Sequence, residues 1–183
     1  IDQLTLGDSN LIYAERGVFV MDQIGGPLVF QFRDLFTDDG IINRGAVAEL
    51  SGQHLVVGQK DIYIHDGNQK RSIANNRVRK QFYNELDDAR SVYCLTVTER
   101  SEVWICYANG DAPDAQSANR ALIYNWNQDA FTFIDLPNCR ALTYSDKLGS
   151  EVTWASLTQS YDEISQPWDA LSKTTEANNI ALF

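Results

Sequence analysis

The sequence has few of the residues on which most catalytic and metal sites depend. It contains two histidines and three cysteines, and the cysteines lie far apart at no spacing typical of a metal site. Their odd number and lack of a pairing pattern predict that Cys94, Cys106 and Cys139 are reduced, buried thiols in a protein that folds in the cytoplasm. Motifs for an activated serine, a phosphate-binding loop or a dinucleotide-binding turn are absent. We therefore predict no enzyme activity and no cofactor.

Positive charge and long apolar runs are also scarce. The 15 Lys and Arg side chains are outnumbered by 25 Asp and Glu, which gives a net charge of -10. A protein that wraps duplex DNA needs clustered cations, so this composition argues against wrapping but allows a channel wall that DNA slides past. No apolar run reaches membrane-spanning length and no signal peptide opens the sequence, so we predict no membrane anchor.

What the sequence does contain is a repeated hairpin pattern rich in aromatic residues. The clearest unit runs from His54 to Ile73, and similar units lie at 11–22 and 121–135. In each, β-branched and aromatic runs flank a short polar break, which predicts a β-hairpin. One hairpin cannot bury its apolar face alone, so the repetition predicts an all-β, mainly antiparallel fold, either a β-sandwich or a β-propeller.

Further strands and a loop are predicted around these hairpins. Residues 91–107 have the pattern of another hairpin, and 152–157 that of a last strand. The small, polar stretch 109–119 predicts a long loop of the kind that often carries contacts. Leu136–Asn138 contains a proline and is predicted to end the third hairpin.

One segment has helical periodicity. Apolar residues recur every four positions from Val78 to Leu86, with charged and amide side chains between them. Asn75 or Asn76 is suited to cap the N-terminus. The sequence therefore predicts one short helix docked beside the sheets.

The same region carries the one basic cluster of an acidic chain. Its members are Lys70, Arg71, Arg77, Arg79 and Lys80. The cluster is either a solvated helix face or a surface that docks on an acidic neighbour, such as an identical subunit. Trp168 poses a similar choice between an anchor in the chain's own core and a plug into a neighbouring chain. We take these six residues as candidate intersubunit contacts.

The histidines and some acidic residues are weaker candidates for a site. His54 and His65 lie on the two arms of the central hairpin and could form a metal or acid–base pair if they face one another. A structural role at strand ends is the simpler interpretation, because no third ligand accompanies them. Asp38–Asp39, and Asp111 with Asp114, offer oxygens for calcium but lack the spacing of a calcium loop. Turn chemistry explains them, so we predict no bound metal.

Several motifs together resemble one known family. They are DIYIHDG at 61–67, RVR at 77–79, EVWICY at 102–107, ALIYNW at 121–126 and DLPN at 135–138. With Trp168–Asp169 near the C-terminus, they extend over about residues 41–171. In this order they resemble the propeller-bearing tail tubular, or nozzle, proteins of short-tailed phages.

The resemblance implies a structural protein of the virion tail that is assembled in the host cytoplasm. Its partners would be identical subunits in a ring, the portal and adaptor proteins, and tail fibre proteins. DNA would pass through the lumen of the ring without sequence-specific binding. The family's β-propeller implies a platform with no catalytic role.

The length of the chain departs from the family. Tail tubular proteins are several times longer than 183 residues, so the chain, which begins at Ile1, is expected to be a fragment or a short relative. A propeller usually needs at least four blades, and the pattern predicts strands for about three. We therefore predict a β-propeller-like or partial propeller domain over 1–157 and an extended C-terminal segment over 158–183.

A second hypothesis comes from a different functional class. A β-propeller with exposed aromatic side chains could bind or hydrolyse carbohydrate, with Trp126 and Trp168 as sugar platforms. The two hypotheses differ in the expected oligomeric state, because a lectin or glycosidase needs no large ring.

Overall fold

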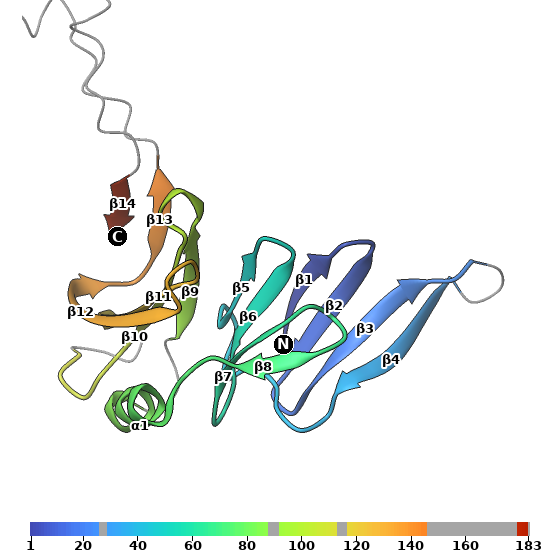
Figure 1. Cartoon of the computed structure of the whole chain (residues 1–183), viewed down its shortest axis with the longest axis horizontal. Coiled ribbons are helices and arrows are strands. Elements are labelled where there is room, and N and C mark those ends of the chain that lie inside the picture. Colours follow the sequence, from blue (N-terminus) through green and yellow to red (C-terminus); the bar gives the residue numbers. More distant parts are fainter. Residues whose placement is uncertain (26–28, 88–91, 113–116, 146–178, 183) are drawn as a thin grey trace, which may run out of the picture. The chain divides into compact units, whose positions relative to one another are not determined.

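The computed structural model describes residues 1–25, 29–87, 92–112, 117–145 and 179–182 (Figure 1). The chain falls into two compact units, Ile1–Ala141 and Leu142–Phe183. Within the described residues, the first unit consists of three four-stranded antiparallel sheets, one α-helix and one short 3-10 helix. The predicted all-β, mainly antiparallel fold with one short α-helix is confirmed.

The three sheets follow one another along the chain. The first sheet contains β1 (Asp2–Leu6), β2 (Ser9–Ala14), β3 (Gly17–Gln23) and β4 (Phe30–Phe36). The second contains β5 (Val47–Leu50), β6 (Gln53–Val57), β7 (Ile62–His65) and β8 (Lys70–Ser72). The third contains β9 (Tyr93–Val97), β10 (Glu102–Tyr107), β11 (Ala118–Asn125) and β12 (Ala130–Cys139), with a 3-10 turn at Thr98–Arg100. Each sheet is a meander in which every strand pairs with the next one, which is also the topology of a propeller blade.

Two apolar cores stack the sheets face to face. The first core joins Leu11, Val18 and Val20 of the first sheet to Val56 and Tyr63 of the second. The other core joins the opposite face of the second sheet to the third sheet and the helix. The second sheet is therefore covered on both sides, which explains why its central strands β6 and β7 are buried without alternation.

The helix α1 (Asn76–Glu85) begins where the sequence predicted. The side chain of Asn75 accepts hydrogen bonds from the backbone N–H groups of Arg77 and Val78, so Asn75 is the N-cap. Phe82 on its apolar face is fully buried in the core shared with the second and third sheets. The predicted stripe thus anchors the helix to the sheets.

One predicted strand end was wrong. Leu136–Asn138 does not end the hairpin, because β12 continues through Pro137 to Cys139. Proline is tolerated here since β12 is an edge strand, so its missing N–H costs no ladder hydrogen bond on the outer side. The pairing register also shifts between Ala118 and Arg120, a bulge that takes up the extra residues of β12.

The second unit is described only in part. Its strands β13 (Leu142–Ser145) and β14 (Asn179–Leu182) pair antiparallel. The predicted domain boundary after residue 157, the predicted strand 152–157 and Trp168 lie outside the described residues. Among the described residues, no helix has the length and apolar character that crossing a membrane requires.

Candidate functional site

The two histidines face one another inside the first unit, and a tyrosine lies between them. His54 on β6 and His65 on β7 are directly opposite in the register of the second sheet. The hydroxyl of Tyr13, on β2, lies 2.5 Å from His54 Nδ1 and 2.8 Å from His65 Nε2. These three side chains, here called the Tyr–His–His cluster, tie the first sheet to the second.

The partners on the far side of each ring assign the direction of every hydrogen bond. His54 Nε2 lies 3.1 Å from the carbonyl oxygen of Thr5, so Nε2 donates and Nδ1 accepts from Tyr13. The backbone N–H of Gly67 donates to His65 Nδ1 over 3.3 Å, so His65 donates through Nε2 to the Tyr13 oxygen. All four ring nitrogens are therefore engaged, and both rings are neutral.

A closed chain of hydrogen bonds of this kind maintains structure and offers no free group to a ligand. All three side chains are at most 1% exposed. Burial raises the pKa of Tyr13 and lowers the pKa of His54 and His65, so each group stays neutral. The geometry supports the structural interpretation of the histidines. Tyr13 was not predicted from the sequence, although its spacing of two from the buried Leu11 places both on the inward face of β2.

Because the cluster requires neutral rings, we expect acid to destabilise the fold. Burial, with a smaller effect of the neighbouring His54, lowers the pKa of His65 from 6.5 to about 4. The unfolded chain therefore binds protons more tightly than the folded chain. The contribution of the neutral His65 to the free energy of unfolding is fully present above about pH 6.5. It is lost as pH falls toward about 4, by about 3 kcal/mol in total.

Urea unfolding at a series of pH values measures this effect. Asp39 opposes it, because burial raises the pKa of that carboxyl and its folded form gains stability as pH falls. Asp22, Asp38 and Asp66 have lowered pKa values and titrate below this window. The variant His65→Gln should show a flatter pH dependence than the wild type. Equal slopes for the two proteins would contradict a buried neutral His65.

The structure separates the basic residues that the sequence grouped together. Lys70 forms an ion pair with Asp38, and Arg79 forms one with Asp61 at 3.3 Å. Arg71, on β8, interacts with the hydroxyl of Tyr124 on β11. The remaining members, Arg77 and Lys80, are exposed on α1. Of the predicted contact residues, Arg77 and Lys80 thus have the cationic groups most accessible to a partner, and Trp168 lies outside the described residues.

An acidic pocket of about 300 Å³ lies where the first sheet's last turn meets the second sheet. Its charged lining consists of Asp38, Asp39, Lys60, Asp61 and Lys70. Besides the two ion pairs above, Asp39 accepts a hydrogen bond from the backbone N–H of Gln59 at 3.2 Å. Each carboxylate of the pocket therefore has a partner within the chain, which agrees with turn chemistry and gives no support to a calcium site.

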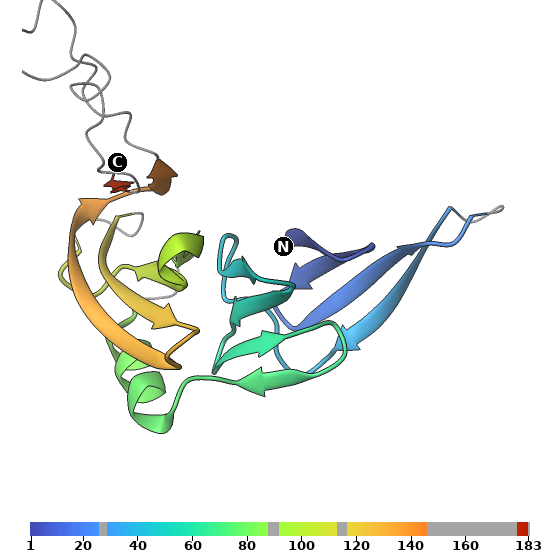
Figure 2. The same ribbon diagram turned by 45° about the horizontal axis from the view of Figure 1, so that its top comes forward.

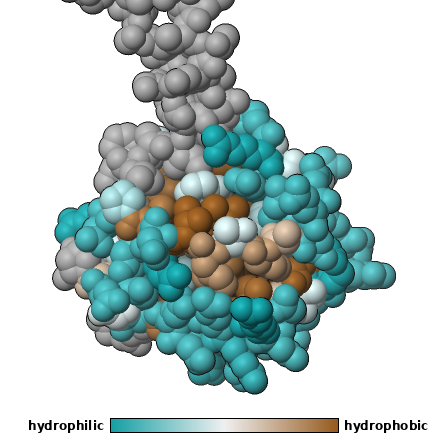
Figure 3. All heavy atoms as spheres, turned by 60° about the vertical axis from the view of Figure 1, so that its left-hand side comes forward, coloured by the Kyte–Doolittle hydropathy of each residue, from teal (hydrophilic) through white to brown (hydrophobic). Residues whose placement is uncertain are grey.

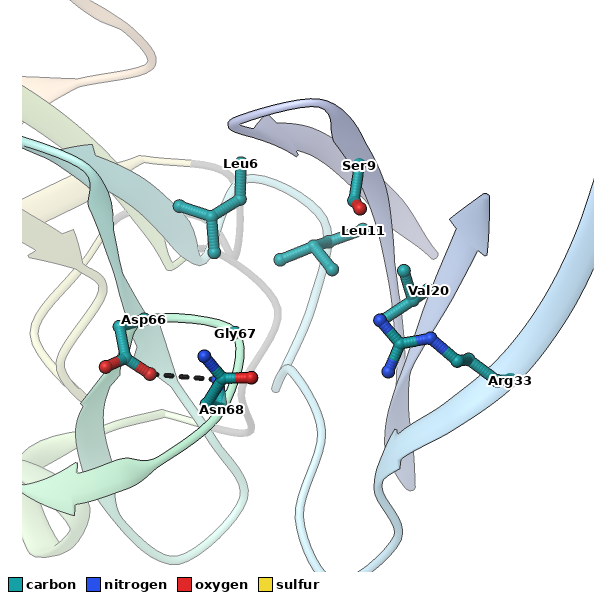
Figure 4. Close-up of a pocket in the computed structure, with 8 residues that line it drawn as sticks. All are labelled: Leu6, Ser9, Leu11, Val20, Arg33, Asp66, Gly67 and Asn68. Carbon is teal, nitrogen blue, oxygen red and sulfur yellow. Dashed lines mark hydrogen bonds between the residues drawn. The ribbon is translucent and has the colours of Figure 1, made fainter. Parts of the chain in front are cut away.

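A smaller pocket of about 190 Å³ lies between the first sheet and the turn that joins β7 to β8 (Figure 4). The carboxylate of Asp66 accepts hydrogen bonds from the backbone N–H groups of Asn68 and Gln69 at 2.9 and 2.8 Å. Arg33 donates to Asp22 over 2.9 Å. Both charged side chains of the lining thus have partners within the chain, which favours a joint between two sheets over a ligand site.

The first and third sheets, which pack on either side of the second, carry partly exposed apolar side chains on the faces that point away from it. Strand registers place Ile12, Phe19, Met21, Phe30 and Phe32 on the outward face of the first sheet. They place Tyr93, Leu95, Trp104, Ile123 and Ile134 on the outward face of the third sheet. Figure 3, which brings forward the side that carries β9–β12, shows hydrophobic side chains gathered within a hydrophilic rim. Exposed apolar patches of this kind are typical of protein contacts.

Trp126 and the three cysteines, which the sequence also singled out, are buried or partly buried in the fold. Trp126, considered as a sugar platform, is partly buried against the core of the second and third sheets. All three cysteines are free thiols, as predicted; Cys106 and Cys139 are buried, and Cys94 is partly buried. Burial raises the pKa of Cys94 and Cys106, which keeps both thiols protonated. None of these residues forms an accessible reactive site.

Comparison of the chain with models of known protein families finds no match. A search of curated proteins finds no similar sequence either. The motifs that resemble tail tubular proteins lie mainly in core strands: β7, β10 and β11 supply many of the buried residues. Residues of this kind reflect the fold more than the activity, so the function implied by the resemblance stays a prediction.

Proposed function

We propose that this chain is a structural subunit of the tail ring of a short-tailed phage, where identical copies surround the channel for DNA. The observation that carries the proposal is the open stack of the first unit. Its sheets pack face to face, while both end sheets keep partly exposed apolar side chains on their outward faces. A stack with such faces is suited to continue through contacts with other subunits. The portal, adaptor and tail fibre proteins are the further partners of this proposal.

The interior chemistry favours a structural role over catalysis. The Tyr–His–His cluster uses all its ring nitrogens to join two sheets. The carboxylates in the acidic pocket are engaged by lysine, arginine and backbone groups of the same chain. Polar networks that are satisfied internally hold a core in one arrangement, as a load-carrying ring requires.

The charge suits a channel through which DNA moves. With a net charge of -10, the chain repels phosphate and offers few cations for counterion release. In this proposal the three meander sheets correspond to three blades, whereas a closed propeller needs at least four. A further sheet, from another part of the chain or from another copy, completes the platform in this proposal.

The proposal predicts a large native assembly. Light scattering on the 20.6 kDa chain should give a mass several times that of a monomer, and electron microscopy should show closed rings. The wild-type ring should not shift the mobility of duplex DNA at physiological salt. A monomer even at about 100 µM, where contacts of micromolar affinity are populated, would contradict the ring.

A further inference from the structure

The β3–β4 hairpin presents an aromatic surface next to an unpaired carboxylate. On its outward face Phe30 and Phe32 are 49% and 60% exposed, beside Met21 of β3. Asp34 follows on the same face of β4 and is exposed, and its carboxylate forms no hydrogen bond or ion pair in the described part of the chain. These four residues are here called the hairpin face.

The hairpin extends beyond the rest of its sheet. The pairing of β2 with β3 ends at Asn10 and Met21, whereas β3 and β4 stay paired as far as Gln23 and Phe30. β4 is also an edge strand, with no partner on its other side among the described residues. A projecting aromatic edge of this kind needs a partner to remove its apolar side chains from water.

The α1 side of the molecule has the complementary charge. Within α1, Arg79 pairs with Asp61 and Glu85 with Arg120, which leaves the cations of Arg77 and Lys80. In the β3–β4 hairpin Arg33 pairs with Asp22, which leaves the carboxylate of Asp34. Arg77 and Lys80 are exposed on α1 and, within the described residues, form no ion pair. Electrostatic complementarity of this kind steers association and fixes its register.

Cations that lie over aromatic rings already occur within this chain. Lys70 Nζ lies 5.5 Å from the ring centre of Phe36 and 5.2 Å from that of Tyr63. The guanidinium of Arg120 lies 5.8 Å from the ring of Phe133. Exposed Phe rings beside a carboxylate are therefore suited to bind Arg or Lys, whose aliphatic stems cover the rings while the charged group pairs with Asp34.

We infer that the hairpin face of one copy docks on Arg77 and Lys80 of α1 in the next copy. Both surfaces belong to the first unit, and Figures 1 and 2 show the β3–β4 hairpin and α1 at opposite ends of it. Two different surfaces at opposite ends give a heterologous, head-to-tail contact, which generates a ring when the rotation closes. This contact rests on the proposed ring function and identifies the surfaces through which identical subunits meet.

A charge-swap series with light scattering tests the contact on the 183-residue chain. The variants Asp34→Lys and Arg77→Asp/Lys80→Asp should each weaken assembly at least about tenfold, as should Phe30→Ser/Phe32→Ser. Circular dichroism should remain unchanged, because all five side chains are exposed. Combining Asp34→Lys with Arg77→Asp/Lys80→Asp should restore much of the assembly. The control Arg44→Asp changes an exposed cation outside both surfaces and should assemble normally.

The outcomes separate this contact from the proposed function. A wild-type ring that survives all of the substitutions would overturn the contact and leave the ring function in place. Loss of assembly in the single-surface variants without recovery in the combined variant would overturn the pairing of these two surfaces. Equal weakening by Arg44→Asp would mean that total charge, and not this contact, controls assembly. A monomeric wild type would overturn both proposals.

Discussion

Replacing Gly40 with alanine is expected to destabilise the first unit by about 4 kcal/mol or more, which would be an exceptional loss for one methyl group. A Cβ atom at this position would lie 1.9 Å from the carbonyl oxygen of Ala14 and 2.7 Å from the backbone nitrogen of Gly17. Both atoms belong to the backbone of the turn that joins β2 to β3, so neither can move aside by a side-chain rotation. The adjacent N–H of Ile41 donates to the same Ala14 carbonyl over 2.9 Å, which fixes the two segments together.

Urea unfolding followed by tryptophan fluorescence measures the loss. The matched control is Gly110→Ala, because a Cβ atom there meets no atom within 4 Å. That variant should stay within about 0.5 kcal/mol of the wild type. If Gly40→Ala were as stable as Gly110→Ala, the close approach of the 38–41 segment to the first hairpin would be disproved.

The sequence predicted those parts of the fold whose causes are local. Apolar runs on either side of polar breaks correctly predicted the hairpins β2–β3, β6–β7, β9–β10 and β11–β12. The helix was predicted with Asn75 or Asn76 as its cap, because the capping residue and the apolar period lie within a few positions of each other; Asn75 is the N-cap. The end of β12 was missed, since Pro137 stops a central strand but is tolerated in an edge strand, and the sequence does not show which strands are edges.

The site depends on contacts that are distant in the sequence. Tyr13 is 41 residues from His54 and 52 from His65, so no motif or spacing connects the three. The need for glycine at position 40 is equally hidden, because the clash comes from the backbone of a different hairpin. The basic cluster was visible in the sequence, but only the structure shows that Lys70 and Arg79 are already paired with aspartates of the same chain.

The Tyr–His–His cluster gives the second large expected effect. Tyr13→Phe removes a hydroxyl that both accepts from His65 Nε2 and donates to His54 Nδ1. The substitution leaves two polar groups of buried rings unsatisfied, each at a cost of about 1–3 kcal/mol, because both histidines are at most 1% exposed. We expect the free energy of unfolding at neutral pH to fall by about 3 kcal/mol, measured by urea unfolding.

Tyr63→Phe is the matched control for this substitution. Tyr63 is also buried in the core between the first two sheets, but its hydroxyl makes one long hydrogen bond, to the carbonyl of Asp39 at 3.4 Å. Its removal should therefore cost no more than about 1 kcal/mol. Because the two variants lose the same atom from the same core, the difference between them isolates the bridge between the histidines. Equal losses in Tyr13→Phe and Tyr63→Phe would mean that the two rings do not depend on Tyr13, and that apolar packing alone holds the first sheet to the second.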